Sequence, residues 1–228
     1  MHTLRIPFPV PPWREFLTEL RIDVAHNPSD IEKQLEVLYR RLNTPGDALH
    51  DLPLLCIRIP GLVLRYREAD GEHYVYVEDP ARRRLAGCVV FNRLIEVDRR
   101  ADPHLRAPHA RFAPAYQRRG IATTIYRWWL DRGNTLITGA RQSTGAHALW
   151  LSLGKHYPLL YVELRARRLR CLGAQVDSRV RQDLYTRIVM LGRGWDVDRL
   201  AHSTGMEVPS GAFTSLGCDA FPAQDSPD

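Results

Sequence analysis

Apolar residues recur with the spacing of an α-helix in three segments of the chain. Around residues 31–42 they fall on one helical face, and the preceding Ser29-Asp30-Ile31-Glu32 is typical of a capping box. Residues 13–22 favour an additional short helix. The apolar residues with helical spacing are Ile31, Leu35, Leu38 and Leu42; Ile121, Ile125, Trp128 and Trp129; and Ala146, Leu149, Trp150 and Leu153.

Segments rich in β-branched and aromatic residues lie between these helices and predict strands. Turn signals at 70–71 and 79–80 separate the early strands, which predicts an antiparallel meander. Residues 98–109 are polar and contain proline, which predicts a loop. The predicted strands are 54–67 (one bent strand or two short ones), 73–78, 84–96, 110–113, 136–138, 159–169 and 184–191.

The order of these elements predicts the fold class. It is typical of a mixed α/β (α+β) domain with a largely antiparallel sheet flanked by helices. We expect residues 1–50 to form an N-terminal helical extension packed on the core, and residues 51–194 to form the domain itself. Residues 195–228 are acidic and rich in Gly, Ser and Pro, which predicts a tail that is either mobile or draped over the domain.

Composition narrows the class of protein. Apolar residues make up 44% and charged residues 25% of the 228 residues, values that are ordinary for a globular domain. No apolar stretch reaches the ~18 residues of a membrane span, and the first residues lack the apolar core of a signal peptide. The 4 cysteines lie far apart without a CxxC pair. This spacing argues against a disulfide scaffold or a zinc site, and we expect a cytoplasmic protein without a metal.

Positive charge is concentrated in one part of the chain. The formal net charge is +6 overall, but it is +12 within residues 104–194, −5 within residues 195–228 and −1 within residues 1–103. Such a field favours an anionic partner, which could be nucleic acid, a membrane surface or a phosphate-bearing ligand.

The sharpest local signal is the segment FAPAYQRRGIA at residues 112–122, which joins a predicted strand to a predicted helix. A helix N-terminus leaves amide N–H groups unpaired and carries a positive partial charge, so that it binds phosphate oxygens. Gly120 permits a tight turn and close approach of a ligand to the backbone, while Arg118 and Arg119 add positive charge. The segment therefore predicts a phosphate-binding loop.

Residues Gln117 to Ala122 resemble the Q/R-x-x-G-x-G/A loop of the GNAT N-acetyltransferases, and residues 112–116 and 146–154 also resemble segments of that family. The resemblance implies a GNAT-like domain that binds acetyl-CoA as co-substrate. It also implies that strand 112–113 diverges from strand 136–138 and admits the pantetheine arm. The implied cofactor-binding residues are Phe112, Ala113, Gln117, Arg118, Arg119, Gly120, Ile121, Ala122, Thr123 and Ser143.

The catalytic groups are harder to place. Where the family often has a tyrosine that protonates the departing thiolate, this chain has Trp150, so Tyr157 is the substitute acid that we expect. Tyr116 is a second nearby phenol. His109 and Glu96 are equal candidates for the general base. Ser143 either contacts the pantetheine, caps the second helix, or does both.

Two functions follow as hypotheses. The first is an acetyl-CoA-dependent N-acetyltransferase that acts by direct attack of an amine. Its acceptor is unknown and could be a small molecule, a protein or an aminoacyl-tRNA. The second is a nucleic-acid- or anion-binding module without activity, suggested by the basic run at residues 165–170. We expect no membrane association, and the oligomeric state is open, with a homodimer as one alternative.

Overall fold

The computed structural model describes residues 28–140 and 142–210. It contains one 8-stranded sheet in the order β1-β2-β3-β4-β5-β8-β6-β7. The strands are β1 (Val63–Ala69), β2 (Glu72–Asp79), β3 (Arg84–Arg93), β4 (Arg106–Phe112), β5 (Leu136–Ile137), β6 (Leu159–Arg165), β7 (Arg168–Gly173) and β8 (Thr186–Met190). The helices are α2 (Pro28–Leu42), α3 (Ile121–Asp131), α4 (Thr144–Leu153), α5 (Ser178–Gln182) and α6 (Val197–Thr204), with 3₁₀ turns η1 (Asp102–His104) and η2 (Pro114–Tyr116).

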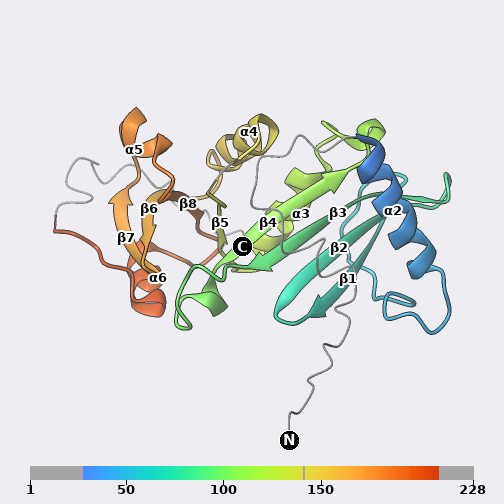
Figure 1. Cartoon of the computed structure of the whole chain (residues 1–228), viewed down its shortest axis with the longest axis horizontal. Helices are drawn as coiled ribbons and strands as arrows, with labels where there is room; N and C mark the ends of the chain where they lie inside the picture. Colours follow the sequence, from blue (N-terminus) through green and yellow to red (C-terminus); the bar gives the residue numbers. More distant parts are fainter. Residues whose placement is uncertain (1–27, 141, 211–228) are drawn as a thin grey trace, which may run out of the picture.

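The sheet is antiparallel except between β4 and β5, which confirms the predicted mixed α/β class with a largely antiparallel sheet. β4 and β5 are parallel and share a single register pair, Arg106 with Leu136. β5 ends one residue later, at Ile137, whereas β4 continues to Phe112. The middle of the sheet is therefore held together at one end of β4 only, and α4 lies near this junction (Figure 1).

Helices cover both faces of the β1–β4 half of the sheet. Phe91 of β3 stacks on Trp129 of α3, with ring centroids 4.2 Å apart. On the opposite face, Arg111 of β4 donates a hydrogen bond to Gln34 of α2. Because side chains alternate along a strand, Arg111 and its register partner Cys88 point away from α3. The two faces of β4 therefore contact different helices.

Residues 106–109 belong to β4, so the predicted loop over 98–109 is wrong in its last four positions. Pro108 suggested a loop because proline has no N–H to donate to a sheet. In the structure it pairs in register with Phe91 of β3, while β5 flanks β4 only at Arg106. A proline fits here because one side of the strand is not engaged in a ladder.

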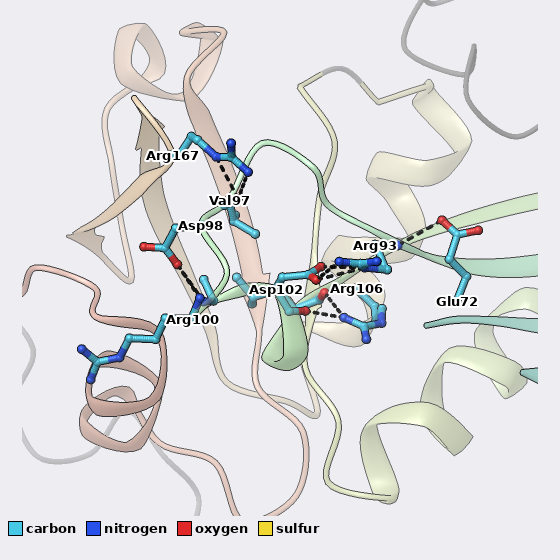
Figure 2. Close-up of polar contacts among 10 residues, drawn as sticks. Glu72, Arg93, Val97, Asp98, Arg100, Asp102, Arg106 and Arg167 are labelled. Atoms are coloured by element: carbon cyan, nitrogen blue, oxygen red, sulfur yellow. Dashed lines mark hydrogen bonds and ion pairs between the residues drawn. The ribbon is translucent and has the colours of Figure 1, made fainter. Parts of the chain in front are cut away.

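The single strand predicted over 159–169 is also wrong, because β6 and β7 form an antiparallel hairpin. Its two central residues, Ala166 and Arg167, have φ of +49° and +66°. Two-residue hairpin turns need positive φ, but they are usually signalled by glycine or asparagine, which this turn lacks. Arg167 secures the turn by donating to the Val97 carbonyl at 3.2 and 3.3 Å (Figure 2).

Three arginines act as structural links in the same region, and one of them, Arg106, belongs to the basic segment at residues 104–194. Figure 2 shows Arg93 bound to the Asp102 carboxylate, with an Nε–Oδ2 distance of 2.9 Å, and Arg106 bound to the Asp102 carbonyl. Arg100 donates to the carbonyl of Ser203 at 3.2 Å and so ties the η1 turn to α6. Part of the excess positive charge is thus used to satisfy backbone carbonyls within the fold.

Residues 195–210 pack on the domain, which supports the draped alternative for this part of the predicted tail. Leu200 of α6 is fully buried, and the Trp195 indole donates to the Gly133 carbonyl at 2.7 Å. Glu207 exchanges backbone hydrogen bonds with Leu169 and Cys171 along the outer edge of β7. Residues 211–228 lie outside the described residues.

The N-terminal extension is described only from residue 28 onward. Helix α2 begins at Pro28, one residue before Ser29, the position that the sequence predicts as its N-cap. Leu35 and Leu42 are buried in the main core, as their helical spacing indicated. The helix predicted at 13–22 lies outside the described residues. Within residues 28–140 and 142–210, no helix combines the length and apolarity needed to cross a membrane.

Candidate functional site

A groove of about 630 Å³ lies where β4 and β5 separate. Its walls come from β4, from the loop that leads into α3, from residues after β5, and from α4. Ile31 of α2 also lines it, and so does Tyr126 of α3, although these two helices cover opposite faces of the sheet. The groove therefore extends through the opening between the two strands.

The loop between β4 and α3 has a defined shape. The Gln117 side-chain amide donates to the Phe112 carbonyl at 2.9 Å and so closes the loop against the end of β4. Arg118 and Gly120 both have positive φ, of +57° and +74°. A Cβ atom at Gly120 would meet no heavy atom within 4 Å, so this glycine faces open space. The chain thus turns sharply and presents the start of α3 to the groove.

The N-terminus of α3 lacks a side-chain cap, because its N-cap residue is Gly120. By contrast, the helices α4, α5 and α6 are capped by Ser143, Asp177 and Asp196, whose side chains accept hydrogen bonds from first-turn amides. The first-turn amides of α3 lie in the groove wall at Ile121, Ala122 and Thr123. They remain available to an acceptor from a ligand, and phosphate oxygens suit such a position.

A buried contact between η2 and β2 fixes the approach to this loop. The Tyr116 hydroxyl donates to Asp79 Oδ2 at 2.7 Å, and Asp79 also accepts from the backbone and guanidinium of Arg82, each at 3.0 Å. The Tyr116 bond in particular, with those from Arg82, lowers the pKa of Asp79 to about 2. The Arg119 guanidinium lies over the Tyr116 ring, 5.7 Å from its centroid. Tyr116 therefore orients the loop through its ring and its hydroxyl.

The structure brings most of the predicted cofactor residues to one place. Ala113 is buried and does not line the groove, and Ser143 lines it while also capping α4 through a 3.2 Å bond from the Ala146 amide. The predicted cofactor residues in the groove wall are Phe112, Gln117, Arg118, Arg119, Gly120, Ile121, Ala122, Thr123 and Ser143.

Two of the three predicted catalytic residues lie away from the groove wall. The Tyr157 hydroxyl donates to Asp131 Oδ1 at 2.7 Å, at the C-terminal end of α3. An 11-residue helix is about 16 Å long, so Tyr157 is held far from the Gly120 loop. Burial, together with the bond to Asp131, raises the pKa of Tyr157 to about 12. Glu96 follows β3 and forms an ion pair with the buried Arg187, with a distance of 3.3 Å between Oε2 and Nη2.

His109 does line the groove, on the face of β4 directed toward α2. Arg111 Nε donates a hydrogen bond to its Nε2 at 3.1 Å. This contact engages the lone pair that His109 would use as a general base at that nitrogen. The pair at 109 and 111 belongs to one face of the strand because side chains two positions apart point the same way.

Three residues of the groove were not singled out by the sequence. Tyr126 is a buried phenol on α3, and burial raises its pKa. Gln142 lines the groove, and its side-chain oxygen is buried without a hydrogen-bond partner among the described residues. Arg111 is half-buried on β4. Helical spacing placed Tyr126 beside the core position 125, but nothing local distinguished it from a packing residue.

Within the described ranges no group of three or more His, Cys, Asp and Glu side chains could hold a metal ion. Comparison with models of known protein families finds no match, and neither does comparison with curated proteins. Function is therefore inferred from the geometry of the groove and from the sequence motifs.

Proposed function

We propose that this protein is an acetyl-CoA-dependent N-acetyltransferase of the GNAT type. The observation that carries the proposal is the uncapped N-terminus of α3, which opens into a groove of about 630 Å³ beside the β4–β5 separation. The amides of residues 121–123 and the guanidinium groups of Arg118 and Arg119 would bind the diphosphate of CoA.

The sheet topology supports the same proposal. A GNAT domain admits the pantetheine arm between two diverging parallel strands, and β4 and β5 share one register pair only. The unpartnered Gln142 side-chain oxygen in the groove wall fits an amide N–H donor, which pantetheine carries twice. Residues of both sheet faces line the groove, so an acceptor could approach from the α2 face while CoA binds beside α3.

The reaction is a direct transfer. The neutral amine nitrogen of the acceptor attacks the thioester carbonyl carbon, a C–N bond forms and the C–S bond breaks. The nitrogen loses one proton, the CoA thiolate takes up one proton, and the products are the acetylated amine and CoA. The protein contributes mainly by positioning the two substrates and by supplying a proton donor near the sulfur.

Tyr126 is the phenol that we assign to this donor role. Burial alone shifts its pKa, with no hydrogen bond from a described residue contributing. The Tyr116 hydroxyl, by contrast, already donates to Asp79. No aspartate or glutamate stands in the described groove wall, so an amine that arrives uncharged, or loses its proton to water, fits the site better than carboxylate base catalysis.

Titration of the purified protein with acetyl-CoA, followed by calorimetry, tests the proposal. We expect saturable binding with a Kd at or below ~100 µM, a concentration within the range typical of enzyme substrates. CoA should compete, and dephospho-CoA should compete less well if the basic loop also contacts the 3′-phosphate. Absence of binding at that concentration would overturn the proposal.

A second candidate function has one observation in its favour. Arg168 and Arg170 project outward from β7, and Arg179 and Arg181 of α5 are exposed as well. The guanidinium of Arg165 stacks over the Tyr185 ring, 4.2 Å from its centroid, which resembles the cation and aromatic mixture of nucleic-acid surfaces. Binding of a labelled RNA or DNA that weakens steeply with salt would support this candidate, and salt-independent or absent binding would exclude it.

A further inference from the structure

Arg111 places a positive charge at the α2 side of the groove. It lies on β4 opposite Cys88 of β3, and it lines the groove together with His109 and Ile31. The phosphate-binding loop belongs to a different part of the groove wall, at the N-terminus of α3. Arg111 is therefore separate from the positive charges that would bind CoA.

No described aspartate or glutamate forms an ion pair with Arg111. Its Nε donates to His109 Nε2 at 3.1 Å and its Nη1 donates to the side-chain oxygen of Gln34. The ionisable group that acts on it electrostatically is the Cys88 thiol, whose pKa burial raises to about 11, so that it carries no charge near neutral pH. Burial also lowers the pKa of Arg111, but a guanidinium stays protonated.

Three other buried or partly buried arginines of the described chain pair with carboxylates, whereas Arg106 binds carbonyl oxygens. Arg41 pairs with Asp47 at 3.0 Å, Arg65 with Glu78 at 2.9 Å, and the buried Arg187 with Glu96 at 3.3 Å. No such ion pair is present at Arg111 within the described part of the chain. A desolvated charge without a counter-charge is costly, and a ligand carboxylate would remove that cost.

We infer that the acceptor is a carboxylate-bearing amine, such as an amino acid, whose carboxylate binds Arg111 at the α2 side of the groove. This inference rests on the proposed acetyltransferase function. The bonds to His109 and Gln34 hold the guanidinium in one orientation and leave Nη2 without a partner among the described residues. A planar guanidinium matches a carboxylate by two parallel hydrogen bonds, and a single positive charge balances a single negative one.

The acceptor preference tests this inference directly. Acetyl-CoA turnover is followed as thiol release with the common L-amino acids, with their decarboxylated amines, and with phosphoethanolamine. We expect kcat/KM for the best amino acid to exceed that for its decarboxylated amine by roughly 10²-fold, because the site would otherwise leave Arg111 unpaired. A preference for phosphoethanolamine over every amino acid, or equal use of the amine pairs, overturns the inference.

Variants of Arg111 separate recognition from folding. Arg111→Gln should raise KM for the amino acid by roughly 10²-fold while it leaves the Kd of acetyl-CoA within about 2-fold, and Arg111→Lys should restore part of the affinity. Arg65→Gln is the matched control, since Arg65 also projects from a strand but is ion-paired outside the groove. It should not change the ratio of kcat/KM between amino acid and decarboxylated amine.

The two proposals fail in different ways. If acetyl-CoA does not bind to the unmodified protein, the proposed function itself fails. If acetyl-CoA binds but no amino acid is acetylated, or if the preference for amino acids survives Arg111→Gln, only the acceptor inference fails. Thermal unfolding of each variant identifies any loss that is due to folding.

Discussion

At the scale of single residues, the side chains that face the groove differ from those that hold its loop in place. Tyr126 and Arg111 present a phenol and a guanidinium to the groove, and neither has a charged partner among the described residues. Tyr116 and Gln117 have a supporting role. Their polar groups bind Asp79 and the Phe112 carbonyl and so hold the loop in place.

Replacing Tyr126 by phenylalanine tests its role as proton donor. Removal of the hydroxyl should lower kcat by roughly 10²-fold, at the lower end of the range for general acids, with the Kd of acetyl-CoA unchanged. Steady-state kinetics and calorimetry measure the two quantities. Tyr157→Phe is the control, because Tyr157 is held at the far end of α3, and a larger kcat loss there than at Tyr126 would contradict the assignment.

The Asp79 carboxylate predicts a dependence of stability on acid. Its pKa is about 2 in the folded protein, below the ~3.9 of an unfolded aspartate. It therefore stabilises the fold above pH ~4, and this contribution is lost as the pH falls toward 2. Urea unfolding at pH 5 and pH 2.5 should show a smaller acid loss for Asp79→Asn than for the unmodified protein. An equal loss in both would refute the assignment.

At the scale of elements, the proposed function depends on how α3 begins. The loop before α3 uses positive φ at Arg118 and Gly120 and provides no side-chain cap, whereas α4 is capped by Ser143. An uncapped N-terminus costs stability, and a bound phosphate would supply the missing acceptors.

Substitution of Gly120 by glutamate should abolish acetyl-CoA binding. The added carboxylate enters open space in front of the α3 amides and repels the diphosphate. Gly61→Glu is a closely matched control, because Gly61 also has φ of +74° with nothing within 4 Å of a Cβ, and it lies outside the groove. Both variants carry the same backbone strain. Equal acetyl-CoA affinity in the two would mean that the phosphate site lies elsewhere.

At the scale of the whole molecule, residues 195–210 are part of the folded unit. Leu200 and Met206 join a second apolar cluster with residues of β5 to β8, and Arg100 links α6 to the loop after β3. The structure also changes the interpretation of the excess positive charge within residues 104–194. Part of it is structural, because Arg106, Arg167 and Arg187 bind carbonyl groups within the fold. The outward arginines of β7 and α5 carry part of the remaining excess.

Leu200→Ala should lower the free energy of unfolding by about 2–5 kcal/mol, because Leu200 is fully buried and its loss leaves a cavity. Denaturant unfolding measured by fluorescence and by far-ultraviolet circular dichroism should remain a single coincident transition, since the sheet continues across both apolar clusters. A loss below 0.5 kcal/mol would show that α6 is not integral to the fold.

The sequence by itself determined what depends on neighbours along the chain. Helical spacing identified α2, α3 and α4, β-branched and aromatic residues between turn signals identified most strands, and residues 112–122 indicated the loop that lines the groove. These features are local, because periodicity and turn chemistry act over a few residues. The β6–β7 turn was not predicted, because its two residues with positive φ are alanine and arginine instead of the usual glycine or asparagine.

Only the tertiary structure decided which groups share the groove. It brought Gln34 to Arg111 across 77 positions of sequence, placed Tyr126 in the groove wall, and held Tyr157 and Glu96 in contacts elsewhere. The start of β4 and the packing of α6 were likewise set by pairing and burial against remote segments. Such contacts depend on the whole folded chain, so no local pattern could have specified them.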